Sequence, residues 1–299
     1  MRYPTLLTIH GGGFVFGKPR DNDSWNRRFA NKHSILVIAL DYRKAPKHCH
    51  PRPHTDIAAL TKAVLKDDSL PIDRDRVAVA GWSAGANLAL GSTVTALLRS
   101  KVSAVVAFYP VVDFVPGKDM KARSRPYKPA LEGFRGQKRD YLYSLIDTFE
   151  WAYLKPGWSR TDPLLSPTHA DFHDFPKYVF TMGCELDMFA MEALKFMCKL
   201  SGREMPVIGD IVGRQEIGSE GELVTEGDER FAWEKRMDDG EIYRWLLVPD
   251  VVHGFDQDII RLFAWLWRDR AMLTDARIKR DKVIDIVGQW LLDGPFKAG

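Results

Sequence analysis

The chain has 299 residues, of which 45% are hydrophobic and 28% are charged, a composition typical of a soluble globular enzyme. Its net charge of +3 is spread along the sequence without a basic block, which argues against a nucleic-acid partner. Its apolar runs are too short to span a bilayer, so we expect no stable membrane insertion.

The three cysteines, Cys49, Cys184 and Cys198, form an odd set without the spacing of a disulfide framework. Such a set indicates free thiols in a reducing compartment. The first apolar strand also begins too early to leave room for a signal peptide. We therefore expect a cytoplasmic protein.

Short apolar segments alternate with helical patterns, which predicts one α/β domain over residues 1–299, with a mostly parallel sheet and helices on both faces. The predicted strands are 5–9, 35–40, 77–80, 105–109, 178–181 and 243–248. The predicted helices are 24–31, 55–65, 84–98, 138–153, 188–200, 257–267 and 277–292. In such a sheet, functional residues gather in the loops that follow the strands.

A glycine-rich loop, His10-Gly11-Gly12-Gly13-Phe14, directly follows the first predicted strand. Three consecutive glycines cost conformational entropy, and they leave backbone N–H groups open to a close approach by substrate. In lipases and esterases a loop of this kind supplies part of the oxyanion hole. We therefore expect the amides of Gly12 and Gly13 to be oxyanion donors.

A second motif, Gly81-Trp82-Ser83-Ala84-Gly85, lies between a predicted strand and a predicted helix. This is the pattern of a nucleophile elbow, a tight turn that holds a serine above the strand ends. The pattern predicts Ser83 as the nucleophile and the Ala84 amide as a third oxyanion donor.

A serine nucleophile needs a histidine base and an acid that orients it, in the chain order serine, acid, histidine. His253 follows the last predicted strand and precedes a predicted helix, which favours it over His169 and His173. Two acids, Glu185 and Asp187, follow the strand 178–181 and lie two positions apart. Asp187 is the favoured acid, and Glu185 is the alternative.

These motifs together resemble the hormone-sensitive-lipase-like branch of the α/β-hydrolases, a group of carboxylesterases and lipases. The segments that carry the resemblance are 10–14 (HGGGF), 41–48 (DYRKAPKH), 80–85 (AGWSAG), 108–110 (FYP), 162–167 (DPLLSP), 184–187 (CELD) and 253–255 (HGF). The resemblance implies an α/β-hydrolase fold with a helical cap. It also implies hydrolysis of short- or medium-chain acyl esters without a metal or other cofactor, and it favours Asp187 as the acid.

The chain departs from that family in three ways. Trp82 and Ala86 stand where the family has aspartate and glycine, and the 201–240 stretch lengthens the interval between acid and histidine. The family also carries cap helices and two strands before its HGGG strand, so we expect an N-terminally shortened sheet with an exposed edge. Unless the edge is covered in some other way, we expect reduced stability, oligomerisation or loss of activity.

Two long segments interrupt the alternation of strands and helices. Residues 114–176 are Pro-rich and aromatic, and we expect them to form a partial, cap-like insertion over the site. Residues 201–240 are rich in glycine and acidic residues, which favours a solvated insertion, with contact to substrate or a partner as the alternative.

Two further groups of side chains have competing interpretations. Phe14 and Trp82 are candidates to line the substrate pocket, although aromatic residues near a sheet are often core. The His48–His54 stretch lacks the ligand spacing of a structural zinc site, so we expect no metal.

The function predicted from the sequence is therefore that of a serine carboxylesterase. A lactonase, amidase or deacetylase using the same residues is one alternative. The other is a non-catalytic protein that binds a small molecule.

Overall fold

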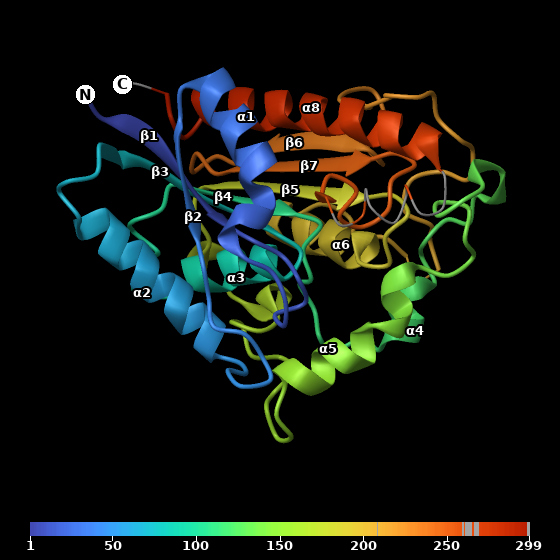
Figure 1. The fold of residues 1–299 in the computed structure, drawn as a ribbon, viewed down its shortest axis with the longest axis horizontal. Helices are drawn as coiled ribbons and strands as arrows, with labels where there is room; N and C mark the ends of the chain where they lie inside the picture. The colour runs from blue at the N-terminus through green and yellow to red at the C-terminus, as the bar shows by residue number, and fades with distance from the viewer. Residues whose placement is uncertain (208, 259, 261–264, 266–268, 298–299) are drawn as a thin grey trace.

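The computed structural model describes residues 1–207, 209–258, 260, 265 and 269–297, and within them one seven-stranded sheet organises the fold (Figure 1). The strand order is β2-β1-β3-β4-β5-β7-β6. The bounds are β1 Tyr3–Ile9, β2 Leu36–Leu40, β3 Ile72–Trp82, β4 Ala104–Phe108, β5 Tyr178–Cys184, β6 Ala232–Arg236 and β7 Ile242–Val248. Neighbouring strands run parallel except β6, which pairs antiparallel with β7.

Helices cover both faces of this sheet, as Figure 1 shows. One face carries α1 (Asp23–His33) and α8 (Arg270–Asp293), and the other carries α2 (Arg52–Lys66), α3 (Ala84–Thr93) and α6 (Ala190–Ser201). Two shorter helices, α4 (Lys118–Ala122) and α5 (Ile146–Tyr153), belong to the 114–176 segment. Short 3₁₀ helices span Pro19–Asn22, Pro129–Leu131, Tyr141–Ser144, Pro167–His169 and Phe172–Asp174. Among the described helices, none is both long and apolar enough to traverse a bilayer.

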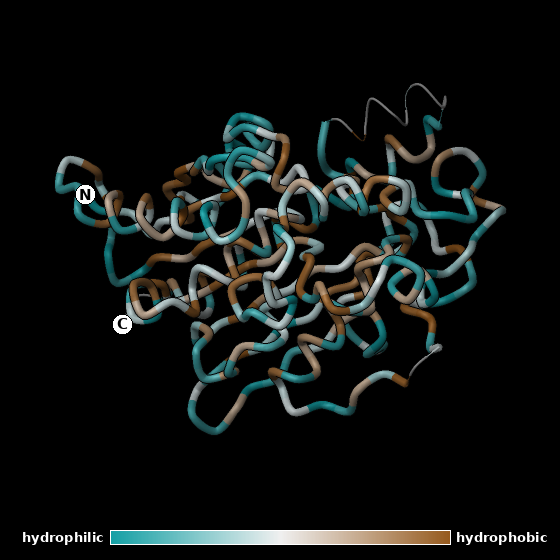
Figure 2. The backbone as a smooth tube through the Cα atoms, turned by 90° about the horizontal axis from the view of Figure 1, so that it is seen from below, coloured by the Kyte–Doolittle hydropathy of each residue, from teal (hydrophilic) through white to brown (hydrophobic). Residues whose placement is uncertain are grey.

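The alternation of side chains along the strands produces one hydrophobic core on each face. In β3, for example, Val77 and Val79 pack in the cluster beside α2, α3 and α6, whereas Ala78 and Ala80 pack in the cluster beside α1 and α8. In Figure 2 the central strands are largely apolar and the peripheral loops largely hydrophilic. Burial on both faces is what a central parallel sheet requires, and it makes the strand ends a rigid support.

The mostly parallel sheet with helices on both faces confirms the fold class predicted from the sequence. The 201–240 stretch contains β6, and most of its other described residues are exposed or half-buried. Only the first two residues of β6, Ala232 and Trp233, are buried, and three charged residues follow them. Apolar and polar residues therefore do not alternate along β6, and its sequence does not predict a strand. Its pairing with β7, rather than its own pattern, makes it a strand.

Three predicted helices also have different outcomes. The helix predicted over 84–98 ends at Thr93, where the Thr93 hydroxyl bonds the Leu90 carbonyl oxygen. The helix predicted over 138–153 is divided into the 3₁₀ helix Tyr141–Ser144 and α5. The helix predicted over 257–267 falls largely on residues outside the described part of the chain.

β2 and β6 form the two edges of the sheet. Residues 36–39 of β2 are half-buried, whereas Leu40 is buried. β2 therefore lies at an edge of the sheet, beside β1 and its glycine-rich loop.

The turn between β3 and α3 fixes Ser83 in an uncommon backbone conformation, with φ 55° and ψ −118°. Two glycines make room for it. A Cβ on Gly81 would lie 2.2 Å from the Gly85 carbonyl oxygen, and a Cβ on Gly85 would lie 2.2 Å from the Ile9 carbonyl oxygen. The sequence G-W-S-A-G thus gives a turn too tight for larger residues at either end.

Candidate active site

The structure brings Ser83, His253 and Asp187 together at the carboxyl ends of three parallel strands. Ser83 follows β3, Asp187 lies three residues beyond β5, and His253 lies five residues beyond β7. The Ser83 Oγ is 2.8 Å from His253 Nε2, and His253 Nδ1 is 2.7 Å from Asp187 Oδ2. In the neutral imidazole, Nδ1–H donates to the carboxylate and leaves Nε2 free to accept from the serine hydroxyl.

The surroundings of His253 favour its protonated form. Burial by itself lowers the pKa of this imidazole, but the charge of Asp187 and its hydrogen bond raise it. The charges of Asp140 and Asp256 act in the same direction, so the pKa of His253 lies above its ordinary value. The Tyr109 ring packs edge-on against the imidazole at a centroid distance of 4.7 Å and limits its rotation.

Glu185, the alternative acid, lies in a separate buried cluster. Its carboxylate accepts hydrogen bonds from the backbone amides of Arg214 and Asp250 and from Lys128 Nζ, each at 2.8 Å. Burial raises the pKa of Glu185, although the Lys128 charge opposes the shift. The two acids therefore have different partners in the structure, with Asp187 beside the histidine and Glu185 beside the lysine.

The glycine-rich loop passes next to Ser83, since a Cβ on Gly11 would lie 3.4 Å from the Ser83 Cβ. Gly12 and Gly13 have φ values of 109° and 60°, a region that glycine enters without strain. A Cβ on Gly13 would lie 2.8 Å from the Phe149 ring. Among the described residues, the amides of Gly12, Gly13 and Ala84 donate to no other protein group, which leaves three donors available near the serine.

Residues of the 41–48 segment hold this loop, a role that the sequence reasoning did not assign. His10 stacks on Tyr42 at a centroid distance of 4.5 Å, and its Nε2 is 3.1 Å from Asp41 Oδ1. The Tyr42 hydroxyl donates to the carbonyl oxygens of His10 and Gly11, each at 3.3 Å. The D-Y-R sequence marks this segment, but nothing in it indicates that Asp41 and Tyr42 contact His10.

A small apolar pocket of about 30 Å³ adjoins the glycine-rich loop. Its lining includes Phe14, which stacks on Tyr153 at a centroid distance of 3.8 Å. The full lining is Phe14, Val111, Phe114, Lys121, Ile146, Phe149, Glu150 and Phe189. Trp82 is absent from this lining; it is 1% exposed and packs against Phe108 behind the elbow, with Nε1 donating to Asp256.

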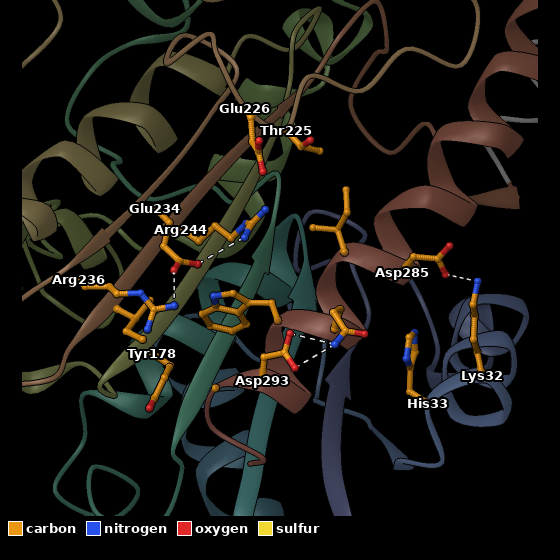
Figure 3. Close-up of a pocket in the computed structure, with 15 residues that line it drawn as sticks. Lys32, His33, Tyr178, Thr225, Glu226, Glu234, Arg236, Arg244, Asp285 and Asp293 are labelled. Carbon is orange, nitrogen blue, oxygen red and sulfur yellow. Dashed lines mark hydrogen bonds and ion pairs between the residues drawn. The ribbon is translucent and has the colours of Figure 1, made fainter.

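A second pocket, of about 580 Å³, lies at the opposite end of the parallel strands (Figure 3). Its lining includes Tyr178 and Ile242, the first residues of β5 and β7, so it is remote from the strand ends that carry Ser83. Figure 3 shows several of its charged side chains paired with one another. The pairs are Lys32 with Asp285, and Arg236 and Arg244 with Glu234.

The residues weighed as metal ligands have other partners. His50 Nε2 lies 3.0 Å from Asp162 Oδ2, and His54 Nδ1 lies 3.3 Å from the Tyr153 hydroxyl. In the described part of the chain, no group of three or more His, Cys, Asp or Glu side chains is placed to hold a metal ion. The three cysteines are free.

Comparison with known proteins identifies the family. Residues 6–209 match the alpha/beta hydrolase fold family, and the chain belongs to that family. The sheet order, the elbow after β3 and the serine–histidine–aspartate contact agree with this membership.

Several relatives are esterases or deacetylases by name. The carboxylic ester hydrolase LipN of Mycobacterium tuberculosis is 34% identical over 176 residues, which cover 56% of this chain and 44% of LipN. The human arylacetamide deacetylase-like 2 protein is 36% identical over 118 residues, which cover 36% of this chain and 29% of that protein. The match therefore spans less than half of the length of these curated relatives.

A solved structure aligns along most of the chain. EstE1, a thermostable carboxylesterase cloned from a metagenomic library, superimposes with a TM-score of 0.62 at 26% identity. The superposition covers 94% of this chain and 80% of EstE1.

The buried cluster around Glu185 leads to a stability prediction. Lys128 is fully buried and contacts the carboxylates of Glu185 and Asp250. Lys128→Met should lower the free energy of unfolding by about 3–5 kcal/mol, because it removes the buried cation that contacts both carboxylates. Denaturant unfolding measures the change.

The matched control is Lys32→Met, which removes a lysine from an exposed pair with Asp285. That change should cost at most about 1 kcal/mol. Equal losses in the two variants would contradict a stabilising role for the buried cluster.

Proposed function

We propose that this chain is a serine carboxylesterase that hydrolyses short- to medium-chain acyl esters. The observation that carries the proposal is the hydrogen-bonded series Ser83–His253–Asp187 beside a glycine-rich loop with free amides. A serine next to a base that is itself oriented by a carboxylate is the arrangement that activates a hydroxyl for acyl transfer.

In the proposed reaction the Ser83 Oγ attacks the ester carbonyl carbon while His253 Nε2 takes the hydroxyl proton. Asp187 stabilises the imidazolium that forms and does not itself take up the proton. The charge of Asp187 already raises the pKa of His253, which matches this role.

The carbonyl oxygen becomes an oxyanion as the new C–O bond forms. We assign its stabilisation to the amides of Gly12, Gly13 and Ala84. Their freedom from other acceptors in the described structure supports this assignment. Ala84 is also the first residue of α3, where the helix dipole favours negative charge. Loss of one such donor typically costs about 10²–10³ in rate.

Collapse of the tetrahedral intermediate breaks the bond to the alcohol, which leaves with the proton from His253. Water then attacks the acyl–serine ester, with His253 again as base, and the acid is released with Ser83 restored. No metal or cofactor takes part in this proposed sequence.

The small pocket supports a preference for short acyl groups. A volume of about 30 Å³, lined by Phe14, Phe149 and Phe189, suits an acetyl group better than an octanoyl chain. Because α5 supplies Phe149, we assign the 114–176 segment as a partial cap over this pocket. An acetyl ester of a bulkier alcohol, a lactone or an acetamide would use the same machinery.

One test of the proposed function concerns the nucleophile. Ser83→Ala should reduce hydrolysis of p-nitrophenyl acetate by at least about 10³-fold, because the attacking oxygen is gone. Wild-type kcat/KM should decrease from acetate to butyrate to octanoate as the acyl chain outgrows the pocket. Release of p-nitrophenol measures both.

The control is Ser159→Ala, at an exposed loop serine that bonds Thr161. It should retain wild-type turnover. Full activity in Ser83→Ala would contradict the proposal, and a folded wild type that binds p-nitrophenyl esters without turning them over would favour the non-catalytic alternative.

Another test of the proposed function concerns pH. Protonated His253 cannot accept the serine proton, so kcat/KM should rise with pH through the pKa of His253. Since that pKa is raised from 6.5, the midpoint of the rise should lie above pH 6.5. A kcat/KM that stays constant down to pH 5 would contradict the role of His253 as general base.

A further inference from the structure

Two consecutive residues of the 114–176 segment hold the backbone of both loops that carry Asp187 and His253. Asp140 caps the 3₁₀ helix Tyr141–Ser144, with Oδ1 accepting from the Leu142 amide at 2.8 Å. Its other oxygen, Oδ2, accepts from the Met188 amide at 2.9 Å. Met188 directly follows Asp187, so Asp140 is bonded to the loop of the acid.

The next residue, Tyr141, is bonded to the loop of the histidine. Its hydroxyl donates to the carbonyl oxygen of His253 at 3.0 Å. The Tyr141 ring packs against Phe134 at a centroid distance of 5.2 Å, which fixes the direction of the hydroxyl. One short stretch of chain thus contacts the backbone beside both members of the histidine–aspartate pair.

A buried arginine, Arg125, also bonds the loop that carries Asp187. Arg125 Nε donates to the Leu186 carbonyl oxygen at 2.8 Å, on the other side of Asp187, and lies 3.9 Å from Asp140 Oδ2. The side chains of Arg125 and Asp140 are 4% and 1% exposed. The backbone on both sides of Asp187 is therefore bonded to the 114–176 segment.

We propose that Asp140 and Tyr141 are positioning residues, which align Asp187 and His253 by bonding the loops that carry them. This inference deepens the proposed function and rests on it. Both loops lie beyond the ends of β5 and β7, and a backbone bond from the Leu186 amide to the Val251 carbonyl oxygen, at 2.9 Å, joins them shortly before Asp187 and His253. Alignment to within about 0.5 Å needs such supports, and a misplacement of about 1 Å can cost 10²-fold in rate.

Asp140 also contributes charge to the site. The charged groups facing His253 are Asp187, Asp140 and Asp256, and those facing Asp140 are Asp187 and Arg125. Burial and the charge of Asp187 raise the pKa of Asp140 to about 6. Removing the Asp140 carboxylate should therefore lower the pKa of His253, an effect that a purely structural contact would not produce.

Tyr141→Phe tests the contact to the histidine loop. It deletes one hydroxyl and keeps the ring packing, so kcat for p-nitrophenyl acetate should decrease about tenfold with KM unchanged. The control is Tyr143→Phe in the same 3₁₀ helix, whose hydroxyl bonds the exposed Asp119 and should be dispensable.

Asp140→Asn tests the contact to the acid loop. Its matched control is Asp171→Asn, since Asp171 caps another 3₁₀ helix by accepting from the His173 amide at 3.0 Å. Asp140→Asn should lower kcat and shift the acid limb of the pH profile to lower pH, whereas Asp171→Asn should do neither.

The pKa of His253 can be measured by NMR titration of the histidine side chains, with His253 assigned through His253→Gln. This measurement separates a failure of the proposed function from a failure of the positioning inference. If the wild type shows no serine-dependent turnover, the proposed function fails. A lower pKa of His253 in Asp140→Asn than in wild type still supports the positioning inference. If Tyr141→Phe does not fold, this comparison of pKa values is the test of the inference. The inference is overturned if Tyr141→Phe matches Tyr143→Phe in kcat, or if the pKa of His253 is the same in Asp140→Asn and wild type.

Discussion

The imidazole of His253 makes two hydrogen bonds at once, to the Ser83 hydroxyl and to the Asp187 carboxylate. This requires three residues to stay within hydrogen-bond distance, and the sheet holds them there. The three residues come from segments more than 60 positions apart in sequence, so only the register of β3, β5 and β7 brings them together. β4 lies between β3 and β5, and helices bury both faces. A sheet packed in this way moves little, which is what a contact of 2.7–2.8 Å between distant segments requires.

The second constraint is the charge gathered around this contact. Asp187, Asp140, Asp256 and Glu185 are buried within a short distance of the strand ends, and each needs donors to remain there. The 114–176 segment supplies two of the cations, Arg125 beside Asp140 and Lys128 beside Glu185. A third, Lys121, contacts the buried Glu192 of α6. The 114–176 segment therefore supplies positive charge that the acidic loops of the core lack.

Local motifs in the sequence predicted the parts of the fold and site that depend on neighbouring residues. The elbow G-W-S-A-G and the H-G-G-G loop each need small residues at fixed positions, and those positions can be read directly. The order of strands and helices followed from periodicity in the same way. Contacts between distant segments gave no such signal. Nothing in the sequence around Lys128 or Tyr141 indicates a partner more than 50 residues away, and β6 is a strand only because β7 is beside it.

The choice between Glu185 and Asp187 illustrates the same limit. The two acids are separated by one residue in a loop, where alternation no longer determines direction, so both remained candidates from the sequence. The structure gives each a different partner through contacts with Lys128 and His253, and neither contact has a local signal.

The most direct test of the account is the reaction of the purified protein with a fluorophosphonate, followed by mass spectrometry of the intact chain and its peptides. Such a probe phosphonylates a serine only where a neighbouring base and an oxyanion site activate it. The account predicts one adduct per chain, located on Ser83. The absence of an adduct on folded protein, or an adduct on a different residue, would contradict the central claim that His253 and Asp187 activate Ser83.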